Sequence, residues 1–438
     1  MGACVAALPP LVVAEEPRLP ERVDALREEH ERLWVMTPAE LPALGPRSGF
    51  RLRLGNEYAA ARLIDTLAAE VERVPEGDRE RRAWRESVRE RLQAFGAARL
   101  GWPGGYGRLL CGDEFFEASI AFTREARAFD PGLPLDGLWQ ALRNVWIGNT
   151  LQLLLDRPVA VNPGLFAYSM LYPLTDNLLD DPGLDGGSKR EFNERFGRRL
   201  AGLPVRPVGA REEAVFRLVS RIEEEFPRPR FTDVHASLLA IHHGQARSLL
   251  QQDAPEIPDA RILAISCEKG GSSVLADLYL VAGHATPSLE LFAFGYGVFL
   301  QLLDDLQDVE TDTAAGHQTL FTRAARRGPL DEATARLARF IDRVLDGADI
   351  LAGPGAADRK DLVRRSCQNL LVGAIADQPR RFTRGFRRSV ERQWPFSLAA
   401  MRRLRRRAER RFTRAASRLQ ARRGAASLAD LAAAEVRR

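Results

Sequence analysis

The chain has 438 residues, of which 45% are hydrophobic and 28% charged, a balance typical of globular proteins. Its net charge is +5, but 19 arginines and only four acidic residues fall between 380 and 438, so the rest of the chain is net negative. The four cysteines form no CxxC pair, which argues against a disulfide framework or a zinc site. No apolar stretch is long enough to span a bilayer, and the first residues lack signal-peptide features, so we expect a cytoplasmic protein.

Apolar residues recur at three- and four-residue spacing through nearly the whole chain, and this periodicity predicts an all-α protein. After a Pro-containing leader, charge-rich helices are expected over 21–35, 56–74 and 79–99. A Gly-rich turn at 101–107 follows them and marks a boundary. We therefore expect 1–105 to form an N-terminal helical extension.

The helices expected after this boundary are more apolar. Asn162 followed by Pro163, and Thr286 followed by Pro287, are typical of helix N-termini. Further helices are expected over 138–155, 211–226, 233–252, 258–282 and 331–352. Together these segments predict a helical catalytic core over 106–375.

The last region, 376–438, is rich in arginine and is expected to be helical. Trp394, Leu398, Met401 and Leu404 recur at helical spacing and predict an apolar stripe beneath the arginines. We interpret the region as a solvated amphipathic helix. Peripheral docking of this basic tail on an anionic membrane is an alternative, and nucleic acid is a less favoured partner.

Two acidic clusters each end an apolar run. The first contains Asp176, Asp180 and Asp181, and the second contains Asp304, Asp305 and Asp308. In each cluster two aspartates are four residues apart and share a helix face, whereas Asp181 and Asp305 lie on the flank. Carboxylates around one apolar cavity would repel without a cation, so the clusters predict a Mg²⁺ site with a phosphate ligand. The alternative, solvated helix ends, is less favoured because both clusters oppose the helix dipole.

Other kinds of metal site are excluded because the sequence lacks their ligand motifs. No histidine follows a glutamate at Glu-x-x-His spacing, and the HExxH, EF-hand and GxxxxGK[ST] motifs are absent. His242 and His243 are therefore expected to form a polar helix face or a pocket wall rather than a pair of metal ligands.

Several segments match the motifs of one enzyme family. Leu300-Gln301-Leu-Leu-Asp304-Asp305-Leu-Gln-Asp308 is similar to the prenyltransferase sequence Phe-Gln-x-x-Asp-Asp-x-x-Asp. Lys269-Gly-Gly-Ser-Ser is similar to a Lys-Thr segment that touches diphosphate, and Gly316-His-Gln-Thr-Leu320 to a Gly-Lys-x-Thr-Leu segment. With the first acidic cluster, residues 115–345 resemble the class I isoprenoid synthases, which include trans-prenyltransferases and class I terpene synthases.

The sequence also departs from the prenyltransferase pattern. The first cluster reads Asp-x-x-x-Asp-Asp, the paired arginines that often follow it are absent at that position, and His317 replaces a lysine. No clear Gly-Lys…Arg segment for isopentenyl diphosphate is present near the N-terminus. These differences favour ionisation and cyclisation of one substrate over chain elongation.

The resemblance implies a helical bundle of the class I isoprenoid-synthase type around a central apolar cavity, with extra N-terminal helices and a basic C-terminal region. By family precedent three Mg²⁺ ions bind the substrate diphosphate. The implied catalytic residues are Asp176, Asp180, Asp304 and Asp308, with Asp181 and Asp305 as further metal ligands. The implied diphosphate-binding residues are Lys269, Arg247, Gly270 and Gly271. The implied pocket residues are Tyr168, Met170, Tyr172, Tyr296, Phe299 and Gln301.

The expected activity is release of diphosphate from an allylic prenyl diphosphate, followed by cyclisation or quenching of the carbocation. The second hypothesis is a trans-prenyltransferase that condenses isopentenyl diphosphate with an allylic diphosphate. The third is a non-catalytic helical binding protein. A homodimer is compatible with each of them.

Overall fold

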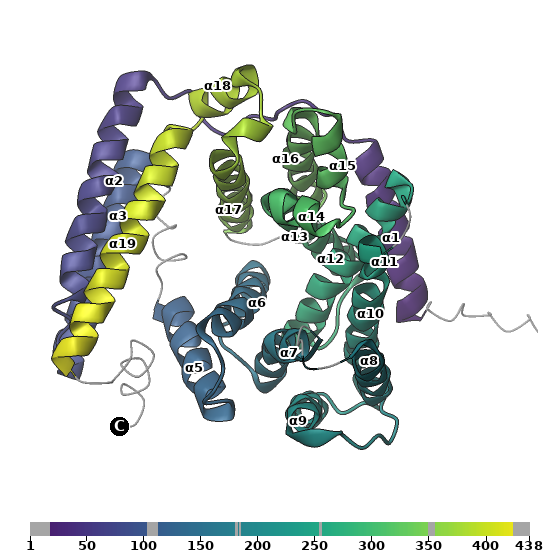
Figure 1. Ribbon diagram of the computed structural model, residues 1–438. Coiled ribbons are helices and arrows are strands. Elements are labelled where there is room, and N and C mark those ends of the chain that lie inside the picture. Colours follow the sequence, from purple (N-terminus) through teal and green to yellow (C-terminus); the bar gives the residue numbers. More distant parts are fainter. Residues whose placement is uncertain are drawn as a thin grey trace, which may run out of the picture.

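The computed structural model describes residues 18–102, 113–179, 183, 185–253, 256–348 and 355–423 (Figure 1). Within these ranges the regular elements are helices and no strand occurs, which confirms the all-α prediction. None of the described helices combines the length and the apolarity needed to cross a membrane. The helices are α1 (Leu19–Val35), α2 (Phe50–Val71), α3 (Asp78–Phe95), the π-helical turn η1 (Gly96–Leu100), α5 (Asp113–Phe129), α6 (Leu135–Leu154), α7 (Pro163–Leu179), α8 (Gly186–Leu200), α9 (Gly209–Glu225), α10 (Thr232–Ser248), α11 (Leu250–Asp253), α12 (Asp259–Ala282), α13 (Pro287–Gln307), α14 (Val309–Ala315), α15 (Leu320–Arg327), α16 (Asp331–Asp346), α17 (Ala356–Asp377), the 3-10 turn η2 (Pro379–Arg381), α18 (Arg384–Arg392) and α19 (Leu398–Arg423).

The centre of the molecule is α12, whose residues are buried on nearly every side. A helix that is apolar all round is expected in the interior. α12 packs most extensively against α13 and α10, and it also contacts α1, α6 and α7. These contacts make α12 the element that sets the positions of the surrounding helices.

Glycines allow α12 and α13 to cross closely. A Cβ on Gly270 would lie 2.5 Å from the carbonyl oxygen of Gly297, and a Cβ on Gly297 would lie 2.1 Å from that of Gly270. Such contacts are too short for any side chain, so both positions require glycine. The close crossing fixes the register between the two helices.

α1 packs on this core and not with α2 and α3. Nη2 of Arg22 in α1 lies 2.7 Å from Oδ2 of Asp233 in α10 and 3.1 Å from Oε1 of Glu290 in α13. The same nitrogen donates a hydrogen bond to Tyr279 Oη in α12 at 3.1 Å. α1 is therefore tied to the core helices α10, α12 and α13, and the division of the chain at residue 105 stays a prediction.

α2, α3 and α19 lie together at one side of the molecule (Figure 1). Charged pairs link α2 and α19: Nε of Arg407 lies 3.0 Å from Asp65 Oδ1, and Nε of Arg411 lies 2.9 Å from the same oxygen. The apolar stripe predicted beneath the arginines is turned inward, because Trp394 and Leu398 are buried. These two residues of the stripe are used for packing within the chain.

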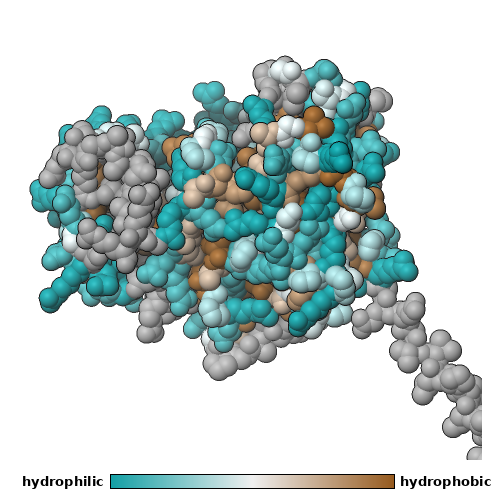
Figure 2. Space-filling model, turned by 90° about the horizontal axis from the view of Figure 1, so that it is seen from below, coloured by the Kyte–Doolittle hydropathy of each residue, from teal (hydrophilic) through white to brown (hydrophobic). Residues whose placement is uncertain are grey.

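The surface is mainly hydrophilic, whereas the interior of the protein is apolar. On the face shown in Figure 2, hydrophilic side chains cover most of the described surface, and hydrophobic side chains lie between them in small groups. The largest fully buried side chains are aromatic or aliphatic, among them Tyr279, Phe166 and Phe294. Most large apolar side chains therefore contribute to one continuous core.

Candidate functional site

The second acidic cluster lies where α13 passes into α14. Asp308 is the C-cap residue of α13, directly before α14. The backbone N–H of Asp312 donates to the Asp308 carbonyl at 2.8 Å, so the helical path continues across the junction. Asp304, Asp308 and Asp312 follow at four-residue intervals and share one side of this path. Partial burial and the negative charges of Asp304 and Asp312 raise the pKa of Asp308. A cation beside these carboxylates would relieve their repulsion.

Asp305 points the other way, into the contact with α12. Its Oδ1 accepts a hydrogen bond from Gln301 Nε2 at 2.8 Å, and its Oδ2 accepts one from Ser266 Oγ at 3.3 Å. Burial raises the pKa of Asp305 to about 7. Asp305 is thus held in the contact between α12 and α13, and Gln301 holds it there and does not line the pocket described below. Neither position supports the role predicted for it, metal binding for Asp305 and a place in the pocket for Gln301.

Basic side chains lie beside the acidic cluster. Nη2 of Arg143 in α6 lies 3.4 Å from Asp304 Oδ1, and Nδ1 of His317 lies 3.3 Å from Asp312 Oδ1. Lys269 in α12 is close enough for its charge to oppose the rise in pKa of both Asp305 and Asp312. Lys269 therefore acts electrostatically on these carboxylates, and its contact with diphosphate stays a prediction.

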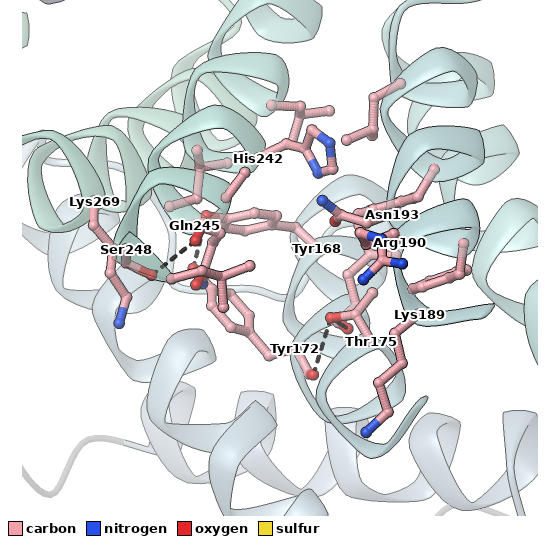
Figure 3. Close-up of a pocket in the computed structure, with 18 of the residues that line it drawn as sticks. Tyr168, Tyr172, Thr175, Lys189, Arg190, Asn193, His242, Gln245, Ser248 and Lys269 are labelled. Carbon is pink, nitrogen blue, oxygen red and sulfur yellow. Dashed lines mark hydrogen bonds between the residues drawn. The ribbon is translucent and has the colours of Figure 1, made fainter. Parts of the chain in front are cut away.

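A pocket of about 570 Å³ opens between α7, α8 and α10 (Figure 3). Its volume lies within the range of small-molecule sites. Its apolar lining comes from Leu171, Phe192, Phe196, Leu200, Leu238 and Ile241. Its polar lining includes Tyr168, Tyr172, Thr175, Asn193, His242 and Gln245. The pocket therefore suits a ligand with a large apolar part.

Three cationic side chains line the pocket. Lys269 approaches from α12, while Lys189 and Arg190 approach from α8 on the opposite side (Figure 3). Because Lys269 also lies close to the acidic cluster of α13, it connects the pocket to those carboxylates. The combination favours a ligand that carries an anionic group at one end of an apolar body.

The polar groups on the pocket wall are largely neutral or hydrogen-bonded. Tyr172 Oη lies 2.8 Å from Tyr168 Oη and 2.6 Å from Ser273 Oγ. Burial, with a smaller effect of His243, lowers the pKa of His242 to about 4, so the ring is neutral at pH 7. Its position confirms the expectation that His242 forms a pocket wall.

Contacts with α12 show where α7 ends. Asn162 Nδ2, at the start of α7, donates to the carbonyl of Leu280 at 2.8 Å, and Tyr172 further along α7 contacts Ser273. α7 therefore runs antiparallel to α12. Asp176 is one helical turn beyond Tyr172, so its backbone lies near the level of Lys269.

α13 also runs antiparallel to α12. Tyr279 Oη donates to Glu290 near the start of α13, whereas Ser266 contacts Asp305 near its end. Ser266 and Ser273 are seven residues, or about 10 Å, apart along α12. The C-terminal ends of α7 and α13 thus reach the same end of the bundle, as the sequence prediction requires.

The side chains of the first cluster are not described: the Asp176 backbone belongs to α7, and Asp180 and Asp181 lie outside the described residues. Among the side chains that are described, no three histidine, cysteine or acidic groups gather closely enough to hold a metal ion. Mg²⁺ commonly binds one or two carboxylates and takes its other ligands from substrate phosphates and water. Asp304 and Asp308 fit that role. Their carboxylates repel each other, so a cation between them would be stabilising, and Asp304 is exposed enough for water and phosphate to complete the coordination.

Gly270 and Gly271 have a different role from the one expected. Both face α13, where a Cβ on Gly271 would lie 2.3 Å from the ring of Phe294. They also lie in the middle of α12, where backbone N–H groups are used within the helix. Their position thus supports a packing function and gives no support to the predicted contact with diphosphate.

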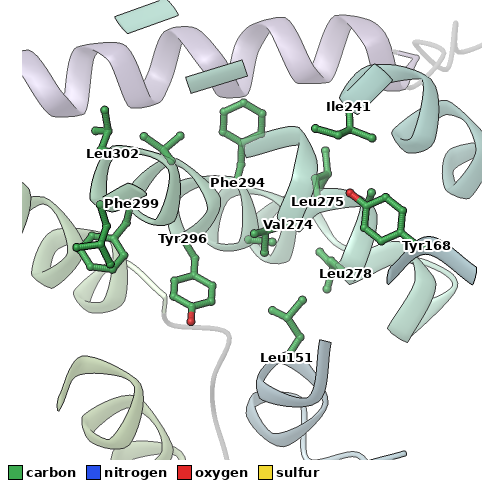
Figure 4. Packing of buried hydrophobic residues seen from close by; sticks show 14 of the residues in the cluster. Leu151, Tyr168, Ile241, Val274, Leu275, Leu278, Phe294, Tyr296, Phe299 and Leu302 are labelled. Carbon is green, nitrogen blue, oxygen red and sulfur yellow. The ribbon is translucent and has the colours of Figure 1, made fainter. Parts of the chain in front are cut away.

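Three predicted pocket residues belong to the core. Met170 and Phe299 have no exposed surface and Tyr296 is 7% exposed, and none of them lines the pocket. Figure 4 shows Tyr296 and Phe299 on α13 among buried leucines and valines. Of the predicted aromatic residues, Tyr168 and Tyr172 do line the pocket, because they occupy the face of α7 turned toward α8 and α10.

Arg247 is exposed and paired with an acidic residue. Its side chain is exposed, and Nη1 lies 2.9 Å from Oε2 of the buried Glu268. Arg247 does not line the pocket, so the predicted contact with diphosphate is not supported by its position.

Sequence reasoning missed Asp312, Arg143, Lys189 and Arg190. The spacing of Asp304, Asp308 and Asp312 was a readable signal, because it extends the same helix face by one turn. The other three are basic residues on polar helix faces, and only the packing of α6 and α8 brings them to the site.

No protein-family model matches this chain, and no curated protein matches it. The described structure agrees with the family resemblance at the level of an all-helical fold.

Proposed function

We propose that the protein is a Mg²⁺-dependent class I terpene synthase that releases diphosphate from one allylic prenyl diphosphate. The observation that carries the proposal is the position of Lys269, which lines an apolar pocket and also lies close to the acidic end of α13. A prenyl diphosphate has the matching shape, with an apolar chain attached to a strongly anionic group.

The acidic ends of α7 and α13 would hold the metal. Asp304 and Asp308 are the proposed ligands from α13, and Asp176 and Asp180 are those from the end of α7. When bound, Mg²⁺ supplies positive charge to the departing diphosphate. Lys269 adds a fixed positive charge at the same place.

The prenyl chain is proposed to occupy the pocket between α7, α8 and α10. As the carbon–oxygen bond breaks, the electron pair leaves with the diphosphate and a carbocation remains on the chain. The apolar wall excludes water from this cation. The rings of Tyr168, Tyr172 and Phe196 can stabilise it through cation–π contacts before it cyclises or is quenched.

A trans-prenyltransferase is the second candidate. Lys189 and Arg190 line the pocket opposite Lys269 and could hold a second diphosphate group. Such a group would come from isopentenyl diphosphate, which adds to the allylic cation.

Incubation of the protein with geranyl, farnesyl and geranylgeranyl diphosphate distinguishes the candidates. A terpene hydrocarbon or alcohol formed only with Mg²⁺ supports the synthase, whereas a longer diphosphate formed only with isopentenyl diphosphate supports the transferase. Lys269→Gln should reduce either activity at least ten-fold, because it removes a charge beside the leaving group. Binding of prenyl diphosphates without turnover of any of them would favour a non-catalytic binding protein and contradict both enzyme proposals.

A further inference from the structure

Apolar side chains are exposed along the first turns of α2. Phe50, Leu54 and Tyr58 are 72%, 56% and 67% exposed and follow at four-residue spacing, so they form one stripe on the helix surface. Arg51 and Arg62 lie on the same outer side, and the guanidinium of Arg62 lies 5.9 Å from the ring centre of Tyr58. Single exposed apolar residues are common, whereas three on one helix face suggest a surface that contacts a partner.

A basic stripe lies on α18. Arg384, Arg388 and Arg392 are exposed, again at four-residue spacing, and none of them pairs with an acidic side chain in the part of the chain that the structure describes. Thr383 caps the first turn of this helix by accepting a hydrogen bond from Phe386 N at 3.2 Å. The three guanidinium groups therefore stand on a well-formed helix and are available to an anionic partner.

The two stripes adjoin. Ser48 N donates to the carbonyl of Arg392 at 2.7 Å, and Arg53 Nη1 donates to the carbonyl of Glu391 at 2.9 Å. Arg392, the last residue of the basic stripe, is thus bonded to Ser48, which is two residues before Phe50, the first residue of the apolar stripe. The two stripes meet at the corner between α18 and α2 (Figure 1). Carboxylates at this corner are engaged within the chain. Glu391 Oε1 accepts from Leu398 N, Glu57 Oε1 accepts from Ser397 Oγ, and the Asp331 carboxylate accepts from Thr383 N and Oγ.

We propose that this corner, formed by Phe50, Leu54, Tyr58, Arg384, Arg388 and Arg392, docks on an anionic phospholipid surface. The arginines would contact lipid phosphates while the apolar stripe inserts between the headgroups, as in interfacial helices. The aliphatic Leu54 between the two rings favours lipid over single-stranded nucleic acid, whose bases need aromatic platforms. The inference does not rest on the proposed enzymatic function.

Co-sedimentation with vesicles of phosphatidylcholine, with or without phosphatidylglycerol, tests this inference. The full chain should bind only vesicles that contain phosphatidylglycerol. Each arginine near an anionic surface contributes about five-fold to binding, so Arg384→Gln, Arg388→Gln and Arg392→Gln together should weaken binding about a hundred-fold. Phe50→Ser with Leu54→Ser should weaken it at least ten-fold.

A matched control comes from α19. Arg406, Arg410 and Arg414 are also exposed at four-residue spacing, and none pairs with a described acidic side chain. Replacing these three by glutamine removes the same charge and should change vesicle binding less than three-fold. Equal loss in the control, or equal binding to neutral vesicles, would overturn the inference. Binding of a single-stranded oligonucleotide that depends on the α18 arginines but not on Phe50 and Leu54 would instead identify a nucleic-acid site.

Discussion

Asp305→Asn is expected to stabilise the protein in a pH-dependent way. The folded chain holds the Asp305 carboxyl in a buried contact between α12 and α13 and raises its pKa from 3.8 to about 7. The unfolded chain releases the proton near 3.8, so between pH 4 and pH 7 only the folded state keeps it. Stability of the wild type therefore falls with rising pH over this window, relative to a variant that cannot ionise.

The size of the effect follows from the shift. About three pH units correspond to about 4 kcal/mol of unfolding free energy. Asparagine preserves the local hydrogen bonds, since its Oδ1 can accept from Gln301 and its Nδ2 can donate to Ser266. The variant should match the wild type near pH 4 and exceed it by up to about 4 kcal/mol above pH 7.

Urea unfolding of both proteins at several pH values, in buffer without divalent cations, measures this difference. Taking the difference between variant and wild type cancels the titration of the other groups. A difference that stays constant from pH 4 to pH 8 would refute the buried position of Asp305.

Two further predictions concern packing and charge. Gly297→Ala should lower the unfolding free energy by about 3 kcal/mol, because the new Cβ would meet the Gly270 carbonyl. Thermal unfolding measures this loss. Gly385→Ala is the control: the nearest atom to its Cβ is 3.9 Å away, so this variant should not destabilise the protein. Asp65→Asn should cost about 1 kcal/mol at low salt by weakening the α2–α19 contact, and the loss should shrink in 1 M NaCl. A loss that does not depend on salt would contradict the ionic role of Asp65. Arg407 lowers the pKa of Asp65, so its contribution should also disappear as the pH falls below the usual range for aspartate.

The local signals in the sequence predicted many helices and their starts. Asn162 accepts a hydrogen bond from Leu165 N at 2.6 Å, and Thr286 accepts one from Leu289 N at 3.4 Å, so both expected N-caps are present. α8 and α17 were not predicted as separate helices. α8 begins with two glycines and its face is strongly charged, so its apolar periodicity is weak even though Phe192 and Phe196 anchor it.

The candidate site could be predicted only in part. Helical spacing shows on which face of its own helix a residue lies, but not which other helix packs against that face. The spacing placed Asp304 and Asp308 on one helix face and Asp305 on another, but it could not show that Asp305 is buried against Ser266. Gly270 gave a correct signal of close approach, and its partner is another helix and not a phosphate. The pocket itself depends on how α8 packs against α7 and α10, which no motif encodes.

The most direct test of the proposed function is diphosphate release from prenyl diphosphates by three proteins: the wild type, Asp304→Asn and Asp305→Asn. The wild type should release diphosphate only with Mg²⁺, and Asp304→Asn should lose at least a hundred-fold in rate. Asp305→Asn should stay within about three-fold of the wild type, because its side chain faces α12. Absence of release by the wild type with every prenyl diphosphate tested, or an unchanged rate in Asp304→Asn, would contradict the account.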